Sequence, residues 1–266
     1  MLGAIIGDIA GSRYERNNIK TRTFPFFSVW DSMTDDSMMT LAIGEALLSA
    51  RKDRTDLGRQ AVASMQRLGR MFPDCGFGRH FSLWLTYEDP MPYGSWGNGA
   101  AMRVSPCGWA GNTLQEVKAL SKAVTEVSHN HPEGLKGAEA AAIAVFLART
   151  GAAKEEIRDY IQKNYYDLNF TLDEIREGYR FDVSCQGSVP QAIKAFLEAD
   201  SFENTIRNAV SIGGDSDTIA AIAGGIGEAF FGIPSSMRNE ALTFFEREEL
   251  LAILNRFEEK YPPKIL

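Results

Sequence analysis

Apolar residues recur at helical spacing along most of this chain, and no other feature constrains its fold as strongly. Val117, Leu120, Val124 and Val127, for example, line one face of an expected helix. The same spacing recurs in segments 41–48, 138–147, 157–161, 189–197, 206–210, 219–231 and 250–257. Two short segments, 24–30 and 181–185, are the candidates for extended chain, and no long alternating pattern is present. This periodicity predicts an all-α fold.

The length and the loops indicate one domain. The chain has 266 residues, which is long for one hydrophobic core but short for two. The segments between the expected helices are rich in Gly, Pro, Asn and Ser, yet none is long enough to be a domain linker. We therefore expect residues 1–266 to form a single helical domain, with the informative residues at helix starts and in loops.

The charge pattern argues against two classes of partner. The chain has 28 basic and 35 acidic side chains, and the basic ones are scattered, whereas a nucleic-acid-binding protein needs a clustered positive face. The apolar N-terminus lacks a basic region and contains Asp8, so it is not a signal peptide. The apolar run 219–233 is too short to span a bilayer and is interrupted by Glu228. We expect neither a nucleic acid nor a membrane as partner.

The cysteine pattern is that of a protein from a reducing compartment. Cys75, Cys107 and Cys185 are widely separated, odd in number and form no C-x-x-C pair. Without a signal peptide or a membrane span, a cytoplasmic location is expected. Cys185 could serve as a nucleophile, but free cysteines are more often simply buried, and we expect it in the core.

Two short motifs, T-D-D-S and G-G-D-S-D-T, each place two carboxylates and a hydroxyl directly before an apolar helical pattern. Asp and Thr also cap helices, which would account for one acid at each start. Four carboxylates brought together would repel and would need a counter-charge. Mg²⁺ and Mn²⁺ prefer such oxygen ligands, and no His/Cys set offers a softer site. The predicted ligands of this split metal site are Asp35, Asp36, Asp215 and Asp217.

A glycine stripe near the N-terminus suggests close packing. Gly3, Gly7 and Gly11 recur every four residues, and the same step ends at Glu15. In a helix, this stripe would let another backbone approach closely while Glu15 projects at its end. Glu15 is then either a fifth carboxylate of the metal site or a surface residue at the end of a packing seam, and the spacing leaves both open.

The segment G-S-W-G-N-G-A-A-M-R leads into a helix that we expect to begin near Ala100. Its glycines would open backbone N–H groups to an anion, and Trp96 could stack on a base; a plain tight turn is the alternative. The motif S-H-N-H-P-E-G contains His129 and His131. Two histidines at i and i+2 without a nearby Cys make a poor zinc site, so we expect them to form hydrogen bonds to the ligand or to the backbone.

Six motifs in order together resemble the ADP-ribosylglycohydrolase family, which includes dinitrogenase reductase-activating glycohydrolase and the ADP-ribosyl-acceptor hydrolases. They are G-D-I-A-G-S-x-Y-E, T-D-D-S, G-N-G-A-A-M-R-V-S-P, S-H-N-H-P-E-G, S-V-P-Q-A and G-G-D-S-D-T-I-A-A-I-A-G. The likeness runs from Gly3 to about Pro234, with Ser37 where most relatives have Thr. It implies a single-domain, orthogonal helical bundle with two Mg²⁺ or Mn²⁺ ions at the bottom of a cleft.

The resemblance also implies roles for individual residues. The implied metal ligands are Thr34, Asp35, Asp36, Asp215, Asp217 and Thr218. The implied substrate-binding residues are Gly94, Ser95, Trp96, Gly97, Asn98, Gly99 and His129. Glu15 matches the mobile glutamate of the family. Glu15, Asp36 or Asp215 would transfer protons during catalysis, as paired carboxylates do in glycoside hydrolysis.

The activity that this resemblance implies is metal-dependent hydrolysis of ADP-ribosylated protein side chains by a metal-activated water. Arginine N-linkage is the first choice and serine O-linkage the second. The chain is shorter than the eukaryotic members, and the loops that would read the modified amino acid are the parts that compare least well. Alternatives are hydrolysis of free ADP-ribose derivatives such as O-acetyl-ADP-ribose, a metal-dependent phosphoesterase and a non-catalytic ADP-ribose-binding module. The expected partner is an ADP-ribosylated protein or an ADP-ribose-containing small molecule, bound by a monomer.

Overall fold

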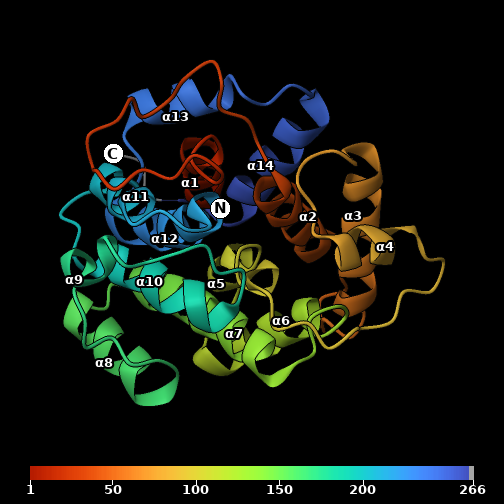
Figure 1. The fold of residues 1–266 in the computed structure, drawn as a ribbon. Helices are drawn as coiled ribbons and strands as arrows, with labels where there is room; N and C mark the ends of the chain where they lie inside the picture. The colour runs from red at the N-terminus through yellow and green to blue at the C-terminus, as the bar shows by residue number, and fades with distance from the viewer. Residues whose placement is uncertain (264–266) are drawn as a thin grey trace.

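A computed structural model describes residues 1–263 of the chain. Within this range it contains fourteen α-helices, one 3₁₀ turn and no β-strand, which confirms the all-α prediction (Figure 1). The elements are α1 (Leu2–Ser12), α2 (Asp35–Ser49), α3 (Leu57–Met71), α4 (Arg79–Thr86), η1 (Asn98–Ala100), α5 (Ser105–Ala110), α6 (Leu114–Thr125), α7 (Pro132–Arg149), α8 (Lys154–Asn164), α9 (Leu172–Arg176), α10 (Cys185–Leu197), α11 (Phe202–Ser211), α12 (Ser216–Phe231), α13 (Ser235–Leu242) and α14 (Glu248–Lys260). None of these helices is both long and apolar enough to cross a membrane.

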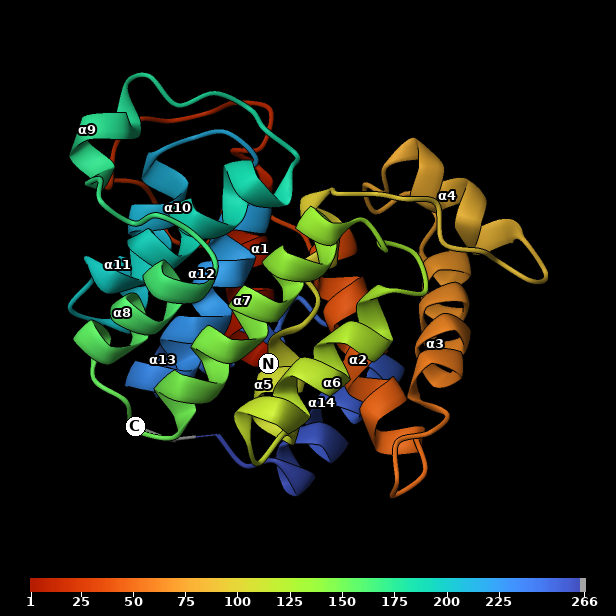
Figure 2. The ribbon, with the colours of Figure 1, turned by 90° about the horizontal axis from the view of Figure 1, so that it is seen from below.

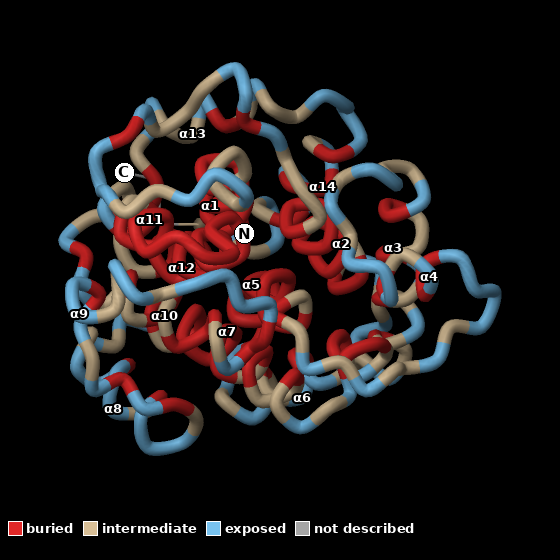
Figure 3. The backbone as a smooth tube through the Cα atoms, viewed as in Figure 1, coloured by how far each residue is buried: buried red, intermediate tan, exposed pale blue. Residues whose placement is uncertain are grey.

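Helix α12 forms the centre of the molecule. Every residue from Ser216 to Ala229 is buried, as expected for a helix that is apolar on all sides. It packs against α1, α7, α10 and α11, while α2, α3 and α4 lie at one side of the molecule and α8 and α9 at the other (Figures 1 and 2). The buried backbone is concentrated around α1, α5, α7 and α12 (Figure 3).

The glycine stripe of α1 is a packing seam against α12. A Cβ atom added at Gly7 would lie 2.0 Å from the carbonyl oxygen of Ala220, and one at Gly3 would lie 2.4 Å from that of Gly224. Only glycine permits this separation. The predicted close approach is therefore confirmed, but α1 ends at Ser12, so Glu15 lies in the turn that follows and not on the helix.

Two local expectations were wrong. The helix expected near Ala100 is replaced by the 3₁₀ turn η1, and α5 begins only at Ser105. A continuous helix would have placed Pro106 in its interior, where it lacks a donor, whereas it now occupies the first turn of α5. Neither 24–30 nor 181–185 forms a strand; the second contributes only an isolated bridge between Ser184 and Gly97.

Candidate active site

The two acidic motifs meet at one cavity of about 450 Å³. Thr34 caps α2, since its Oγ1 accepts from the amide of Asp36 at 3.3 Å, and Asp215 directly precedes α12. The cavity wall includes all six predicted metal ligands and Glu15: Glu15, Thr34, Asp35, Asp36, Asp215, Asp217 and Thr218. Residues about 180 positions apart are thus brought together by the packing of α2 and α12 around α1.

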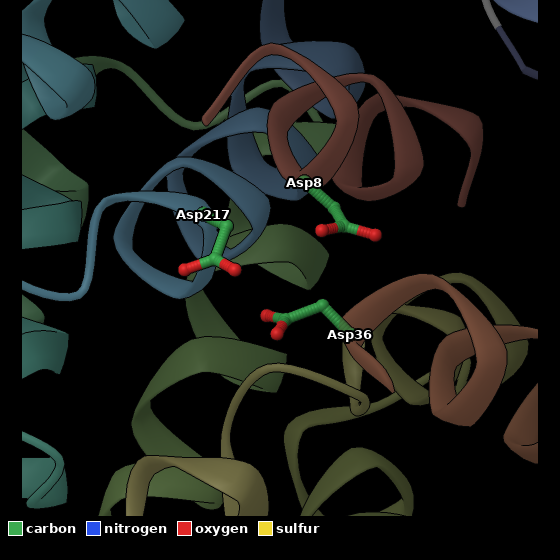
Figure 4. Close-up of side chains that lie close together, drawn as sticks. All are labelled: Asp8, Asp36 and Asp217. Atoms are coloured by element: carbon green, nitrogen blue, oxygen red, sulfur yellow. The ribbon is translucent and has the colours of Figure 1, made fainter. Parts of the chain in front are cut away.

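Three buried aspartates from three helices point toward one another (Figure 4), and two of them, Asp36 and Asp217, line the cavity. One carboxylate oxygen each of Asp8, Asp36 and Asp217 lies within 4.8 Å of the others. The Oδ2 atom of Asp36 accepts from the Thr218 hydroxyl at 3.1 Å, but its Oδ1 atom is buried without a hydrogen-bond partner. A buried oxygen without a donor is costly unless a cation completes its surroundings.

Asp8 is the member of this cluster that the sequence did not identify as a site residue. It accepts from the amide and the hydroxyl of Thr34 at 2.8 and 2.7 Å, and from the amide of Ser37 at 3.1 Å. The Ser37 hydroxyl also donates to Asp8. Ser37 stands where most relatives have Thr, and this hydrogen bond needs only the hydroxyl that both residues carry. The sequence signal was a single carboxylate within the otherwise apolar α1, which needs a buried partner.

Burial and mutual repulsion raise the pKa of these carboxyl groups. Burial raises the pKa of Asp36 well above its usual value, and Asp217 adds to the shift; burial and then Asp215 do the same to the pKa of Asp217. The pKa of Asp8 is raised by burial to about 6, opposed by hydrogen bonds from Ser37 and Thr34. Burial, with Asp8 next, raises the pKa of Asp35 to about 8.

The donor set therefore fits a hard divalent cation. Carboxylate and hydroxyl oxygens are the ligands that Mg²⁺ and Mn²⁺ prefer. A cation at the cluster would offset the burial and repulsion that raise these pKa values, and its binding would favour the ionised carboxylates. Among the described residues, only Asp8, Asp36 and Asp217 form a compact acidic triad of this kind, while Asp35 and Asp215 lie on the wall of the same cavity.

Asp215 and Glu15 are neighbours in this wall. The Oδ2 atom of Asp215 accepts from the Nδ2 of Asn98 at 2.6 Å, and Asn98 also donates to the Ser188 hydroxyl at 3.0 Å. Asn98, predicted to bind substrate, thus orients a predicted metal ligand. Glu15 is partly buried, and its pKa is raised by burial and then by the charge of Asp215.

The glycine loop contributes only part of its predicted set to the cavity. Ser95, Gly97, Asn98 and Gly99 line it. Gly94 and Trp96 are not among the described residues of its wall; the Trp96 ring is half-exposed and lies 5.4 Å from the His131 ring, between centroids. Aromatic and apolar side chains that the sequence did not indicate also line the cavity: Phe81, Tyr93, Met102, Phe181 and Val183. So do three basic side chains: Arg79, His80 and Arg103.

The two histidines have separate positions. His129 is buried and lines the cavity, and its Nδ1 lies 2.9 Å from the Ser128 hydroxyl. His131 caps α7 by accepting from the amide of Glu133. Neither belongs to the acidic triad. His131 bonds to the backbone as predicted, whereas His129 bonds to a side chain and its contact with ligand stays a prediction.

Cys185 is a core residue. It is fully buried, and burial raises the pKa of its thiol to about 12. Its Sγ atom lies 3.2 Å from the carbonyl oxygen of Gly97. A thiol with so high a pKa is a poor nucleophile, which agrees with the expectation of a buried cysteine.

Comparison with known proteins shows to which family this chain belongs. The ADP-ribosylglycohydrolase family model matches residues 1–264. ADP-ribosylhydrolase ARH3 of Bos taurus is 24% identical over 340 aligned residues, covering 98% of this chain and 92% of that protein. ADP-ribosylarginine hydrolase Tri1 of Serratia proteamaculans (strain 568) is 25% identical over 260 aligned residues, covering 87% of this chain and 70% of that protein.

The fold is shared with a solved structure described as an ADP-ribosylglycohydrolase-related protein complex. The TM-score is 0.68 at 24% identity, and the alignment covers 96% of this chain and 95% of the other. The structural alignment and the match to the family model both cover nearly the whole sequence. The chain is therefore a glycosidic-bond hydrolase and belongs to the ADP-ribosylglycohydrolase family.

Proposed function

We propose that this protein is a divalent-metal-dependent hydrolase that removes ADP-ribose from modified protein side chains. The observation that carries the proposal is the convergence of Asp8 with two residues of the cavity wall, Asp36 and Asp217, with the buried Oδ1 of Asp36 left without a donor. Two Mg²⁺ or Mn²⁺ ions would be held by Thr34, Asp35, Asp36, Asp215, Asp217 and Thr218. Such ions supply Lewis acidity, which orients sugar hydroxyls and lowers the pKa of water.

Proton transfer is the task of the carboxyl groups around the cavity. Glu15 is the first candidate, because it lines the cavity, its side chain has no hydrogen bond among the described residues and its pKa is raised by burial and by Asp215. A raised pKa makes a carboxyl group a stronger base and lets it hold a proton to higher pH, as an acid–base catalyst requires. Asp36 and Asp215 are the alternatives. Departure of the acceptor from the anomeric carbon builds positive charge on the sugar, which the surrounding carboxylates stabilise.

The residues of the cavity wall outside the acidic motifs support a role in binding ADP-ribose. The loop residues Ser95, Gly97 and Gly99 face the cavity beside His129, and polar groups with exposed backbone suit a pyrophosphate. The half-exposed Phe181 on the same wall offers a surface on which an adenine ring can stack. A monomeric state and a cytoplasmic location remain part of the proposal.

For the acceptor we propose arginine N-linkage first and serine O-linkage second. The support is analogy alone, since one relative bears the name ADP-ribosylarginine hydrolase. The test is release of intact ADP-ribose from arginine- and serine-modified peptides in Mg²⁺ or Mn²⁺, with Asp35→Asn and Asp217→Asn alongside. We expect turnover by the unchanged protein and a loss of at least about a hundredfold in both variants, as for removal of a metal ligand.

The products of the same assay separate the remaining possibilities. Release of AMP or phosphate would indicate a phosphoesterase. Turnover of O-acetyl-ADP-ribose without turnover of either peptide would place the activity on free ADP-ribose derivatives. Binding of ADP-ribose without any turnover would leave a binding module. Unimpaired Asp35→Asn and Asp217→Asn variants would contradict the metal role.

A further inference from the structure

A buried arginine in the cavity wall, Arg103, has no acidic partner among the described residues. Arg103 is fully buried, and it forms no ion pair with any described Asp or Glu. Its Nη2 donates to the Ser128 hydroxyl at 2.8 Å and, at 3.4 Å, to the carbonyl oxygen of Val124. Its guanidinium lies 5.6 Å from the centroid of the Phe81 ring. A buried cation without a counter-charge is costly, which indicates that Arg103 has a function in the cavity.

The hydroxyl of Ser128 connects this arginine to His129. Ser128 is fully buried, and its Oγ lies 2.8 Å from Nη2 of Arg103 and 2.9 Å from Nδ1 of His129. Arginine can only donate, so the Ser128 oxygen accepts from it and keeps its own hydrogen for another acceptor.

Among the described residues, Nδ1 of His129 is the only acceptor within reach of that hydrogen. If Nδ1 carried a proton, the Ser128 hydrogen would be buried without a partner. Nδ1 therefore accepts, and in the neutral ring the proton resides on Nε2.

The Nε2 atom of His129 is directed at the ligand side of the site. It forms no hydrogen bond within the described residues, and His129 is part of the cavity wall. A Cβ atom added at Gly99 would lie 3.2 Å from this nitrogen, and one at Gly97 would lie 3.8 Å from it. The two glycines therefore leave room for a ligand atom beside Nε2.

We propose that Arg103 and Ser128 are positioning residues that fix His129 as the neutral Nε2–H tautomer, so that Nε2 donates a hydrogen bond to a ribose or phosphate oxygen of the bound ligand. The identity of the ligand rests on the proposed function. His129 is then a permanent donor and takes no part in proton transfer, which is left to the carboxyl groups. Burial and the charge of Arg103 both lower the pKa of His129, which agrees with a ring that stays neutral.

The test is ¹⁵N NMR of protein labelled only at histidine. The chain has three histidines, so spectra of His80→Asn and His131→Asn variants assign the His129 signals by elimination. We expect the pattern of a neutral ring protonated at Nε2, unchanged between about pH 5 and 8, a range in which an ordinary histidine titrates. An Nδ1–H tautomer or an imidazolium at neutral pH would overturn the proposal.

Ser128→Ala and Ser121→Ala form a matched pair for the second arm. Both serines are buried, but the Ser121 hydroxyl has no hydrogen-bond partner. Ser128→Ala should allow both tautomers and weaken ADP-ribose binding about tenfold by calorimetry, the loss of one buried hydrogen bond. Ser121→Ala should change neither. An Nε2–H pattern and an affinity that survive Ser128→Ala would refute the role of Ser128.

The two arms separate this proposal from the proposed function. If ADP-ribose fails to bind the unchanged protein, the proposed function fails, while the tautomer measured without ligand still decides whether Arg103 and Ser128 fix the ring. If ADP-ribose binds, its addition should shift the Nε2 signal of His129 more than the Nδ1 signal. An unchanged Nε2 signal in the complex would refute the donor role.

Discussion

Asp8 holds Thr34 by two hydrogen bonds, one to its amide at 2.8 Å and one to its hydroxyl at 2.7 Å. The first turn of α2 is thereby fixed to α1. Because α1 is in turn packed without space against α12, the two acidic motifs have a fixed separation. A carboxylate that orients metal ligands in this way typically contributes as much to metal affinity as a weak ligand does.

Asp8→Ala should therefore weaken Mn²⁺ binding about tenfold to a hundredfold, the usual effect of removing a residue that orients metal ligands. Isothermal titration calorimetry on the metal-free protein measures this directly. Asp31→Asn is the matched control, because Asp31 is also buried but pairs with Arg13 outside the triad. An Asp8→Ala variant that binds Mn²⁺ as tightly as the Asp31→Asn control would show that Thr34 needs no such support.

The second prediction concerns the cost of the cluster in the absence of metal. At pH 8 and after removal of divalent ions, Asp36→Asn should raise the free energy of unfolding by about 1 to 2 kcal/mol, because asparagine avoids the burial and repulsion that disfavour an ionised Asp36 and raise its pKa. The asparagine retains an oxygen that can accept from the Thr218 hydroxyl. Urea denaturation measures the change.

Excess Mn²⁺ should reverse that order, because the unchanged protein gains binding free energy that the variant cannot. Asp159→Asn, at an exposed position on α8, should leave both values nearly unaltered. A variant that is less stable than the unchanged protein in chelator would mean that the Asp36 carboxylate is not strained.

The third prediction is an inverted pH dependence of the metal-free protein. The pKa values of Asp8 and Asp31 are raised by burial to about 6, and that of Asp35 to about 8. The folded state then binds more protons than the unfolded state above the ordinary aspartate pKa, so the free energy of unfolding falls as pH rises. Stability should decrease from pH 5 to 8 in urea titrations.

Saturating Mn²⁺ should flatten most of this slope, because a bound cation keeps the cluster carboxylates ionised at every pH in the range. Asp31 pairs with Arg13 outside the cluster. Its contribution to the slope of the free energy of unfolding with pH should persist with metal and disappear in Asp31→Asn. A metal-free protein that becomes more stable from pH 5 to 8 would contradict the raised pKa values.

The helical fold could be predicted because its signal is local. Apolar spacing is repeated within each of α6, α7 and α12, and the glycine stripe of α1 is a pattern of four-residue steps. The paired carboxylates were equally visible, since each pair lies at the start of a helix. Their meeting at one cavity was inferred from chemistry, as four acids in one place need a cation.

The unpredicted parts depend on contacts between distant residues. Asp8 has no acidic neighbour in the sequence, and its relation to Thr34 exists only when α1 and α2 pack together. Asn98 was expected to face substrate, yet its amide reaches Asp215 across more than a hundred residues. No spacing rule specifies which side of a glycine loop faces a cavity. The position of Trp96 outside the cavity wall therefore could not be predicted from the sequence either.

The fourth prediction compares two aromatic side chains that differ in position and not in exposure. Phe181 and Trp96 are 52% and 53% exposed, but Phe181 lines the cavity and Trp96 does not. If adenine stacks on Phe181, Phe181→Ala should weaken ADP-ribose binding by about 1 to 3 kcal/mol, the usual contribution of one base stacked on an aromatic ring. Trp96→Ala should weaken it by less than about 0.5 kcal/mol, as for other surface changes away from a site.

Calorimetry with ADP-ribose and with ribose 5-phosphate separates the contribution of the base from that of the rest of the ligand. Only the affinity for ADP-ribose should differ between Phe181→Ala and the unchanged protein. A larger loss in Trp96→Ala than in Phe181→Ala would mean that the loop at Trp96 turns inward when ligand binds, and that the adenine lies on the other side of the cavity.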